Sequence, residues 1–125
     1  MLTLTSLRGD DAGALVVTMP DRLSTTVAHR VLELLDGGHV KTVGVLGNMV
    51  HTTARKRRAS GGPRRLAKEF GVPLLGLLPY DLTVAAAVEK GSIEGLLRTE
   101  FARNLRMSMA PYLRGLGRGA RRARA

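Results

Sequence analysis

Polar side chains follow two apolar runs of the sequence, and their types suit ligand binding. Asn48 and Met49 come after the run VGVLG, and Pro79, Tyr80 and Asp81 come after or close the run PLLGLLP. The amide of an asparagine offers a donor and an acceptor that match the edge of a purine, while Met49 and Pro79 could pack on the face of a base. A local interpretation is also open, because asparagine is common in turns and aspartate is a frequent helix cap.

Three short apolar runs, at residues 14–19, 40–46 and 74–78, predict the buried strands that position these side chains. Helical patterns over residues 22–35 and 63–70 lie between them, so the strands are joined by crossovers that make them parallel. Parallel strands end at one edge of a sheet, where open α/β sheets bind ligands. We therefore predict a three-layer α/β fold, a partial parallel sheet of three strands flanked by helices on both faces.

The helix predicted over residues 22–35 has an apolar residue at every fourth position, which indicates one face turned to the core. These residues are Leu23, Val27, Val31 and Leu35. Ser24 is a candidate cap at its start, and Gly37 and Gly38 mark its end. A parallel sheet of only three strands leaves an uncovered edge, so we expect something else to complete it.

Two further helices are expected after the last strand. Asp81 or Thr83 caps a short helix that ends before Gly91, and a longer helix begins near Ser92 and extends to Leu113. Residues 1–113 therefore form one partial α/β domain. The last twelve residues contain five Arg, three Gly and no acidic residue, so residues 114–125 are predicted to be a basic, disordered tail.

The formal net charge of +10 in 125 residues favours partners that carry phosphate or other anionic groups. Much of this charge lies in the loop before the second predicted helix, at the start of that helix and in the tail. The candidate nucleic-acid contacts are Arg55, Lys56, Arg57, Arg58, Arg64, Arg65, Arg121 and Arg122. A solvated loop and tail would explain the same residues without a ligand. Since aromatic side chains that could stack on bases are few, any nucleic-acid binding is expected to be independent of sequence.

The sequence lacks the residues that several kinds of functional site require. The phosphate-cradling pattern GxxxxGK[ST] does not occur in the sequence. The histidines His29, His39 and His51 are scattered, so we expect solvent-facing or capping side chains and no metal site. With no cysteine in the sequence, disulfides and thiolate ligands are excluded, and the cytoplasm is the expected compartment. No apolar run is long enough for a transmembrane segment.

Three segments, in order, resemble those of a known family. They are VVTMP at residues 16–20, GVLGNM at residues 44–49 and LAKEFGVPLLGLLPYD at residues 66–81. They are similar to the C-terminal half of Mrp/MinD/ParA-type P-loop ATPases, and most of all to the Mrp-like ATP-binding iron–sulphur carriers. The resemblance implies a truncated P-loop NTPase or Rossmann-like fold, with residues 1–113 as a partial nucleotide-binding domain. It also implies that Asn48, together with the Pro79 and Asp81 region, contacts adenine.

Comparison with the family's pattern also indicates which parts of a complete ATPase this sequence lacks. The family's N-terminal half, with a Lys-bearing phosphate loop and catalytic carboxylates, has no counterpart here, and the CxxC pair common in Mrp-type members is replaced by VHTTARKRRASGG. We therefore expect a protein that binds ATP weakly on its own, holds no iron–sulphur cluster through a CxxC pair, and needs a second chain to supply the phosphate loop for hydrolysis. Two alternatives stay open: a non-catalytic nucleic-acid-binding module, and a homodimer paired through the exposed sheet edge.

Overall fold

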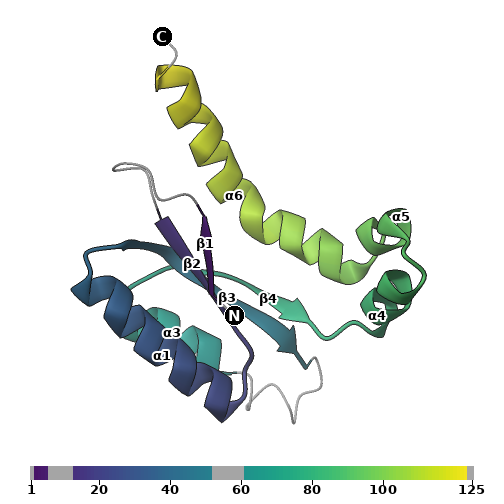
Figure 1. Cartoon of the computed structure of the whole chain (residues 1–125), viewed down its shortest axis with the longest axis horizontal. Coiled ribbons are helices and arrows are strands. Elements are labelled where there is room, and N and C mark those ends of the chain that lie inside the picture. The colour runs from purple at the N-terminus through teal and green to yellow at the C-terminus, as the bar shows by residue number, and fades with distance from the viewer. Residues whose placement is uncertain (1, 6–12, 52–60, 124–125) are drawn as a thin grey trace. The chain divides into compact units, whose positions relative to one another are not determined.

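The computed structural model describes the backbone of residues 2–5, 13–51 and 61–123, and the side chains of residues 13–51 and 61–114. The chain divides into two compact units, Met1–Tyr80 and Asp81–Ala125. The first unit contains, in order, β1 (Leu2–Thr5), β2 (Gly13–Thr18), α1 (Arg22–Gly37), β3 (Lys41–Val50), α3 (Gly62–Phe70) and β4 (Leu74–Pro79) (Figure 1).

The strands of the first unit form one sheet in the order β1-β2-β3-β4. β2, β3 and β4 are parallel, and their carboxyl ends lie at one edge, with Thr18 opposite Gly47 and Val50 opposite Pro79. The predicted α/β class, three parallel strands flanked by helices, is therefore confirmed. β1 pairs antiparallel with β2 and is an addition to the prediction, because its alternating pattern covers only four residues.

The core of the first unit lies between the sheet and the helices α1 and α3. β2 alternates half-buried and buried residues along its length, as expected of a strand with one face against the core. The buried members of this core are Ala14, Val16, Ala28, Leu32, Leu35, Val45, Leu66 and Ala67. The two helices thus cover the same face of the sheet, whereas the sequence analysis predicted helices on both faces. Both helices begin near the carboxyl edge of the parallel strands.

The first turns of α1 and α3 follow from their sequences. Asp21, rather than Ser24, is the N-cap of α1, and its carboxylate accepts from the Ser24 backbone N–H at 2.8 Å. Pro63 lies in the first turn of α3, and Gly71 ends this helix with a left-handed φ of 63°, both as predicted. At the end of α1, the residue in the left-handed region is His39, with a φ of 56°, one position after the predicted glycine pair.

The buried face of α1 coincides only in part with the predicted stripe, because Leu35 is buried in the core and Val31 packs against it. Ala28, Leu32 and Leu35 pack against the sheet, whereas Leu23 is 75% exposed and Val27 is 55% exposed. The prediction was wrong for Leu23 and Val27 because the apolar residues of α1 cover about half of its circumference, and periodicity alone did not identify the part that meets the sheet.

The second unit is entirely helical, with α4 (Leu82–Glu89), α5 (Ile93–Leu97) and α6 (Glu100–Ala123). Asp81 caps α4 and Ser92 caps the short α5, so the single helix predicted from residue 92 is two helices. α6 continues to Ala123, which differs from the disordered tail predicted for residues 114–125. Arg and Ala have high helix propensities, which compensate for the glycines of this segment. Among the helical residues that the structure describes, none forms a segment long and apolar enough to cross a membrane.

Candidate functional site

Asn48 and Met49 form an irregular step near the end of β3. The strand continues through them to Val50 instead of turning after Leu46, and its pairing with β4 shifts between Gly47 and Val50. Met49 has a φ of 54°, in the left-handed region that costs a non-glycine residue about 1–2 kcal/mol. The Asn48 side-chain oxygen accepts from the Met49 backbone N–H at 2.9 Å. This bond orients the Asn48 amide and leaves its NH₂ group as the donor for another partner.

A pocket of about 500 Å³ lies beside this step, at the carboxyl end of β2. Its lining comes from the end of β2 and the turn after it, from the first half of α1, and from Asn48 and Met49. Most of the lining is apolar, and its polar groups belong to Thr18, Ser24 and Asn48. Binding pockets for small organic molecules commonly have this composition. Of the five predicted site residues, Asn48 and Met49 are the two that line this pocket within the described part of the chain.

Pro79 and Tyr80 lie at the end of β4, next to the end of β3. Pro79 is opposite Val50 in the sheet, and the Tyr80 backbone N–H donates to the Val50 carbonyl at 3.0 Å. The Tyr80 ring is half exposed, and its centroid lies 5.7 Å from that of His51. The structure thus brings four of the five predicted residues to the carboxyl ends of two neighbouring strands, with Asn48 and Met49 on β3, Pro79 at the end of β4 and Tyr80 directly after it.

Asp81, the fifth predicted residue, begins the second unit and has a structural role there. Its Oδ1 accepts from the Thr83 backbone N–H at 2.9 Å and from the Thr83 hydroxyl, and its Oδ2 accepts from the Phe101 backbone N–H at 3.2 Å. The bond from the Thr83 hydroxyl, followed by that from Phe101, lowers the pKa of Asp81 below its ordinary value of 3.8. The cap interpretation of Asp81 is therefore confirmed, and its contact with adenine stays a prediction.

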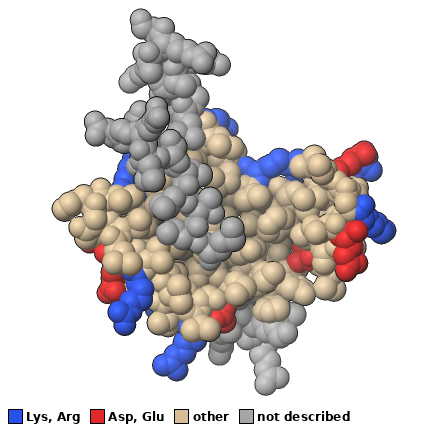
Figure 2. All heavy atoms as spheres, viewed as in Figure 1, with Lys and Arg blue, Asp and Glu red and all other residues tan. Residues whose placement is uncertain are grey.

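The candidate nucleic-acid residues are only partly within the described structure. Arg64 and Arg65 are exposed on α3, and Lys68 is exposed one turn further on. Arg55, Lys56, Arg57 and Arg58 lie outside the described residues, and so do the side chains of Arg121 and Arg122 in α6. On the face that Figure 2 shows, the described Lys and Arg side chains stand in small separate groups within a mostly uncharged surface.

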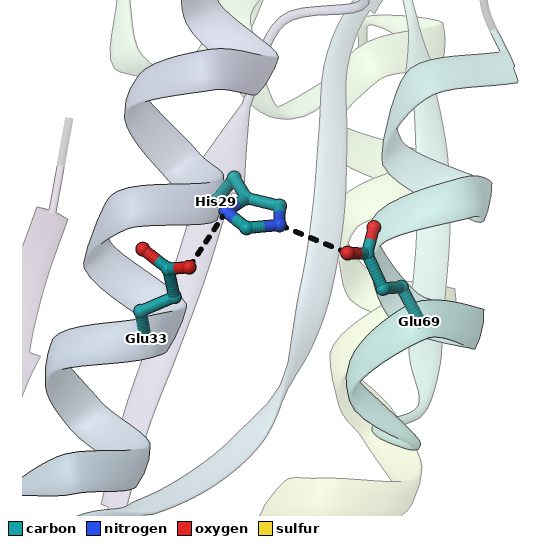
Figure 3. A network of polar contacts seen from close by, with 3 residues as sticks. All are labelled: His29, Glu33 and Glu69. Atoms are coloured by element: carbon teal, nitrogen blue, oxygen red, sulfur yellow. Dashed lines mark hydrogen bonds and ion pairs between the residues drawn. The ribbon is translucent and has the colours of Figure 1, made fainter.

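His29 is the one histidine whose surroundings differ clearly from the prediction. Its Nε2 lies 2.9 Å from the Glu69 carboxylate on α3, and its Nδ1 lies 3.5 Å from the Glu33 carboxylate on α1 (Figure 3). The Phe70 ring meets the imidazole edge-on at 5.0 Å between centroids. Because the two carboxylates lie at opposite sides of the ring, they do not converge on a common point for a metal ion. The cluster connects α1 to α3.

The fold defines a class of protein, the open α/β domains with parallel strands, and ligands of this class bind at the carboxyl edge of those strands. Comparison with known families makes the assignment specific. The profile of the ParA family, described as NUBPL iron-transfer P-loop NTPase, matches residues 1–109. The chain belongs to this family, as the resemblance in the sequence predicted.

Curated relatives have names connected with iron–sulfur clusters. The chain is 30% identical over 89 residues to the cytosolic Fe-S cluster assembly factor cfd1 of Aspergillus terreus, a match that covers 66% of this chain and 29% of that protein. It is 32% identical over 87 residues to the iron-sulfur cluster carrier protein of Synechocystis sp., covering 64% of this chain and 25% of the relative. The chain therefore spans about a quarter to a third of the length of these relatives.

Solved structures of MinD share the fold. The MinD cell division protein of Aquifex aeolicus superposes with a TM-score of 0.66 at 21% identity, over 82% of this chain and 44% of that chain. The cell division ATPase MinD of Pyrococcus furiosus gives a TM-score of 0.58 at 23% identity, over 83% of this chain and 43% of that chain. More than half of each MinD chain thus lies outside the shared region.

The sequence pattern did not identify the pocket residues on β2 and α1. Thr18 ends β2 and Met19 follows it, both within the segment VVTMP that the family resemblance had already singled out, so this segment was the available signal. Leu23 and Val27 were assigned to the core instead, because their spacing fits an inward-facing helical stripe.

Proposed function

We propose that this chain forms the adenine-side part of an ATP site of the ParA type, and that it binds and hydrolyses ATP only when a phosphate-binding part completes the site. The observation that carries the proposal is the step at Asn48 and Met49. A left-handed non-glycine residue of this kind is energetically costly, and such residues gather at functional sites. The step lies at the carboxyl edge of the parallel strands, where α/β sheets bind their ligands.

The chemistry of the step suits a purine. The Asn48 oxygen is occupied by the Met49 backbone N–H, so the amide NH₂ group is the part that can donate to a ring nitrogen of adenine. Met49 is 46% exposed and Tyr80 is 51% exposed, and both offer apolar surface to the face of a base. Pro79 and Asp81 complete the set that the family resemblance implies.

The phosphate side of the site has to come from elsewhere. The sequence has no GxxxxGK[ST] loop, whose backbone N–H groups and lysine would hold the phosphates. Charge-assisted contacts to phosphate are among the strongest hydrogen bonds available, so an adenine-side part alone is expected to bind ATP poorly. The relatives carry names of iron–sulfur proteins, but this chain has no cysteine and supplies no thiolate to a cluster. The cytoplasm is the compartment we propose, in line with the cytosolic Aspergillus relative.

Calorimetry with ATP tests the proposal in two stages. The chain alone is expected to show no micromolar binding. A chimera, in which the amino-terminal half of the Synechocystis carrier is joined in front of Leu2, is expected to bind ATP. In that chimera Asn48→Ala should weaken binding by about two- to tenfold, the effect of losing one hydrogen bond worth roughly 0.5–1.5 kcal/mol. Thr26→Ala, on the exposed surface of α1, is the control and should leave affinity unchanged. Micromolar ATP binding by the chain alone, or equal affinities of the Asn48→Ala chimera and its parent, would contradict the proposal.

A second candidate function is sequence-independent binding of nucleic acid. The exposure of Arg64, Arg65 and Lys68 along α3 favours it, since none of the ion pairs found among the described residues involves these side chains. Replacing Arg64 and Arg65 by Ala should lower the steepness with which DNA affinity falls as salt rises, by about 0.9 for each phosphate that the variant no longer neutralises. An unchanged salt dependence would exclude these two arginines from the interface.

A further inference from the structure

His51 and Tyr80 place two rings beside each other at the carboxyl edge of the sheet. Their ring centroids lie 5.7 Å apart, with an angle of 33° between the ring planes. This separation is within the range of about 4.5–7 Å at which aromatic rings attract each other. His51 follows β3 and Tyr80 follows β4, and these two strands are neighbours in the sheet (Figure 1). We call the two rings the aromatic pair.

The backbone of the two strands fixes the position of the aromatic pair. Val50 is opposite Pro79 in the register of the sheet. The residues that follow these two are therefore level with each other, which brings their side chains together. The Tyr80 backbone N–H donates to the Val50 carbonyl at 3.0 Å and extends the pairing of the strands by one residue. Because this bond belongs to the main chain, a change of either ring leaves it in place.

Both members of the aromatic pair are open to solvent. Tyr80 is 51% exposed, and His51 is also exposed. The chain contains two Phe, two Tyr and no Trp, and Phe70, in contrast, packs against the core. A half-exposed ring keeps part of its apolar face in water, where a ligand can cover it. The aromatic pair thus offers flat apolar surface at the edge of the sheet where α/β domains bind their ligands.

The chemistry of the aromatic pair suits the face of a nucleobase. Every base has a π-face, and stacking of that face on an aromatic side chain contributes strongly to the binding of bases by proteins. A purine, with two fused rings, covers more of such a surface than a pyrimidine does. Hydrogen-bonding groups contact the edge of a base instead, which is the role proposed for the Asn48 amide. Face and edge are therefore bound by different residues.

We infer that His51 acts together with Tyr80 as the stacking surface for the adenine base. The inference rests on the proposed function, and it adds His51, a side chain that the sequence led us to expect in solvent without a ligand. It also assigns to the aromatic pair a preference for purines over pyrimidines that does not depend on Asn48.

Adenosine tests the inference on the chain alone, because this nucleoside has the base but no phosphate that a further part of the site would have to hold. The ring protons of His51 and Tyr80 are followed by NMR as adenosine is added to millimolar concentration. Stacking should shift them to higher field, and cytidine should produce clearly smaller shifts. Tyr80→Leu and His51→Ala should each weaken adenosine binding at least about fivefold, the lower end of the effect of removing an aromatic side chain that stacks on a base.

Two control variants separate stacking from other effects. Tyr80→Phe keeps the ring and should bind adenosine as the parent protein does, whereas Tyr80→Leu keeps only an apolar side chain. His39→Asn changes an exposed histidine before the opposite end of β3 and should leave adenosine binding unchanged. The shifts in the parent protein need no substitution, so a variant that folds poorly does not decide the result.

Unshifted ring protons of His51 at millimolar adenosine overturn the inference. So do equal affinities of Tyr80→Leu and Tyr80→Phe, and so does a loss of binding in His39→Asn as large as that in His51→Ala. The Synechocystis chimera tests the proposed function separately. Stacking of adenosine on the chain alone, without ATP binding by the chimera, would preserve the stacking surface and refute the proposed function. ATP binding by the chimera that depends on Asn48 but not on His51 would support the proposed function and refute the inference.

Discussion

Gly62 allows the start of α3 to lie close to the start of α1, and its replacement tests how tightly the carboxyl edge of the sheet is built. A Cβ at this position would lie 2.5 Å from the Thr25 methyl carbon and 3.3 Å from the Pro20 carbonyl oxygen. Thr25 has little freedom to move, because its hydroxyl is hydrogen-bonded to the carbonyls of Asp21 and Arg22 at 3.0 and 3.1 Å. Overpacking typically costs about 1–3 kcal/mol, while Gly→Ala gains about 0.4–1 kcal/mol through lower chain entropy. We therefore expect Gly62→Ala to reduce the free energy of unfolding by about 1–2 kcal/mol.

Gly61 is the matched control for this substitution. A Cβ there would meet nothing within 4 Å, and its φ of −71° is one that alanine adopts freely. Gly61→Ala should therefore stay within about 0.5 kcal/mol of the parent protein. Urea unfolding measures the difference: with a slope of about 1–3 kcal/mol per molar, Gly62→Ala should lower the midpoint by roughly 0.3–2 M. Equal midpoints for the two variants would refute the argument that close packing at Gly62 fixes α3 against α1.

Three further predictions concern stability. His39→Gly should raise the free energy of unfolding by about 0.5–1 kcal/mol, because His39 is exposed and its backbone lies in the left-handed region that glycine adopts freely. Gly71→Ala should lower the free energy of unfolding by a similar amount, because Gly71 has the same backbone geometry. Thermal unfolding of both variants checks the opposite signs. The pKa of Asp81 is lowered on folding, so the contribution of this carboxylate to stability is fully present above its ordinary pKa of 3.8 and is lost as the pH falls through the lower folded value. In acid, the urea midpoint of Asp81→Asn should therefore fall less steeply than that of the parent protein. An identical acid profile of the two proteins would contradict this. Leu32→Ala should lower the free energy of unfolding, measured in urea, by about 2–5 kcal/mol, since Leu32 is 1% exposed. Leu34→Ala, at an exposed position of the same helix, should change it by less than about 0.5 kcal/mol. Similar losses in the two variants would mean that the buried face of α1 is misassigned.

The parallel sheet could be predicted because its strands have clear borders in the sequence. The run at residues 74–78 follows a proline, and the run at residues 14–19 lies between a glycine and a proline, so each could only be a short strand. The order of strands and helices then gave the parallel arrangement and the ligand-binding edge. The step at Asn48 and Met49 could not be predicted in the same way. A turn and a strand irregularity use similar residues, and pairing with β4 decides between them.

The surfaces of α1 show a different limit of sequence reasoning. Leu35 fits both the predicted stripe and the observed buried face, and the helix carries apolar residues on either side of it. The sequence predicted a single apolar stripe against the core, and the contacts with the sheet were needed to show that Leu23 and Val27 lie outside the buried face.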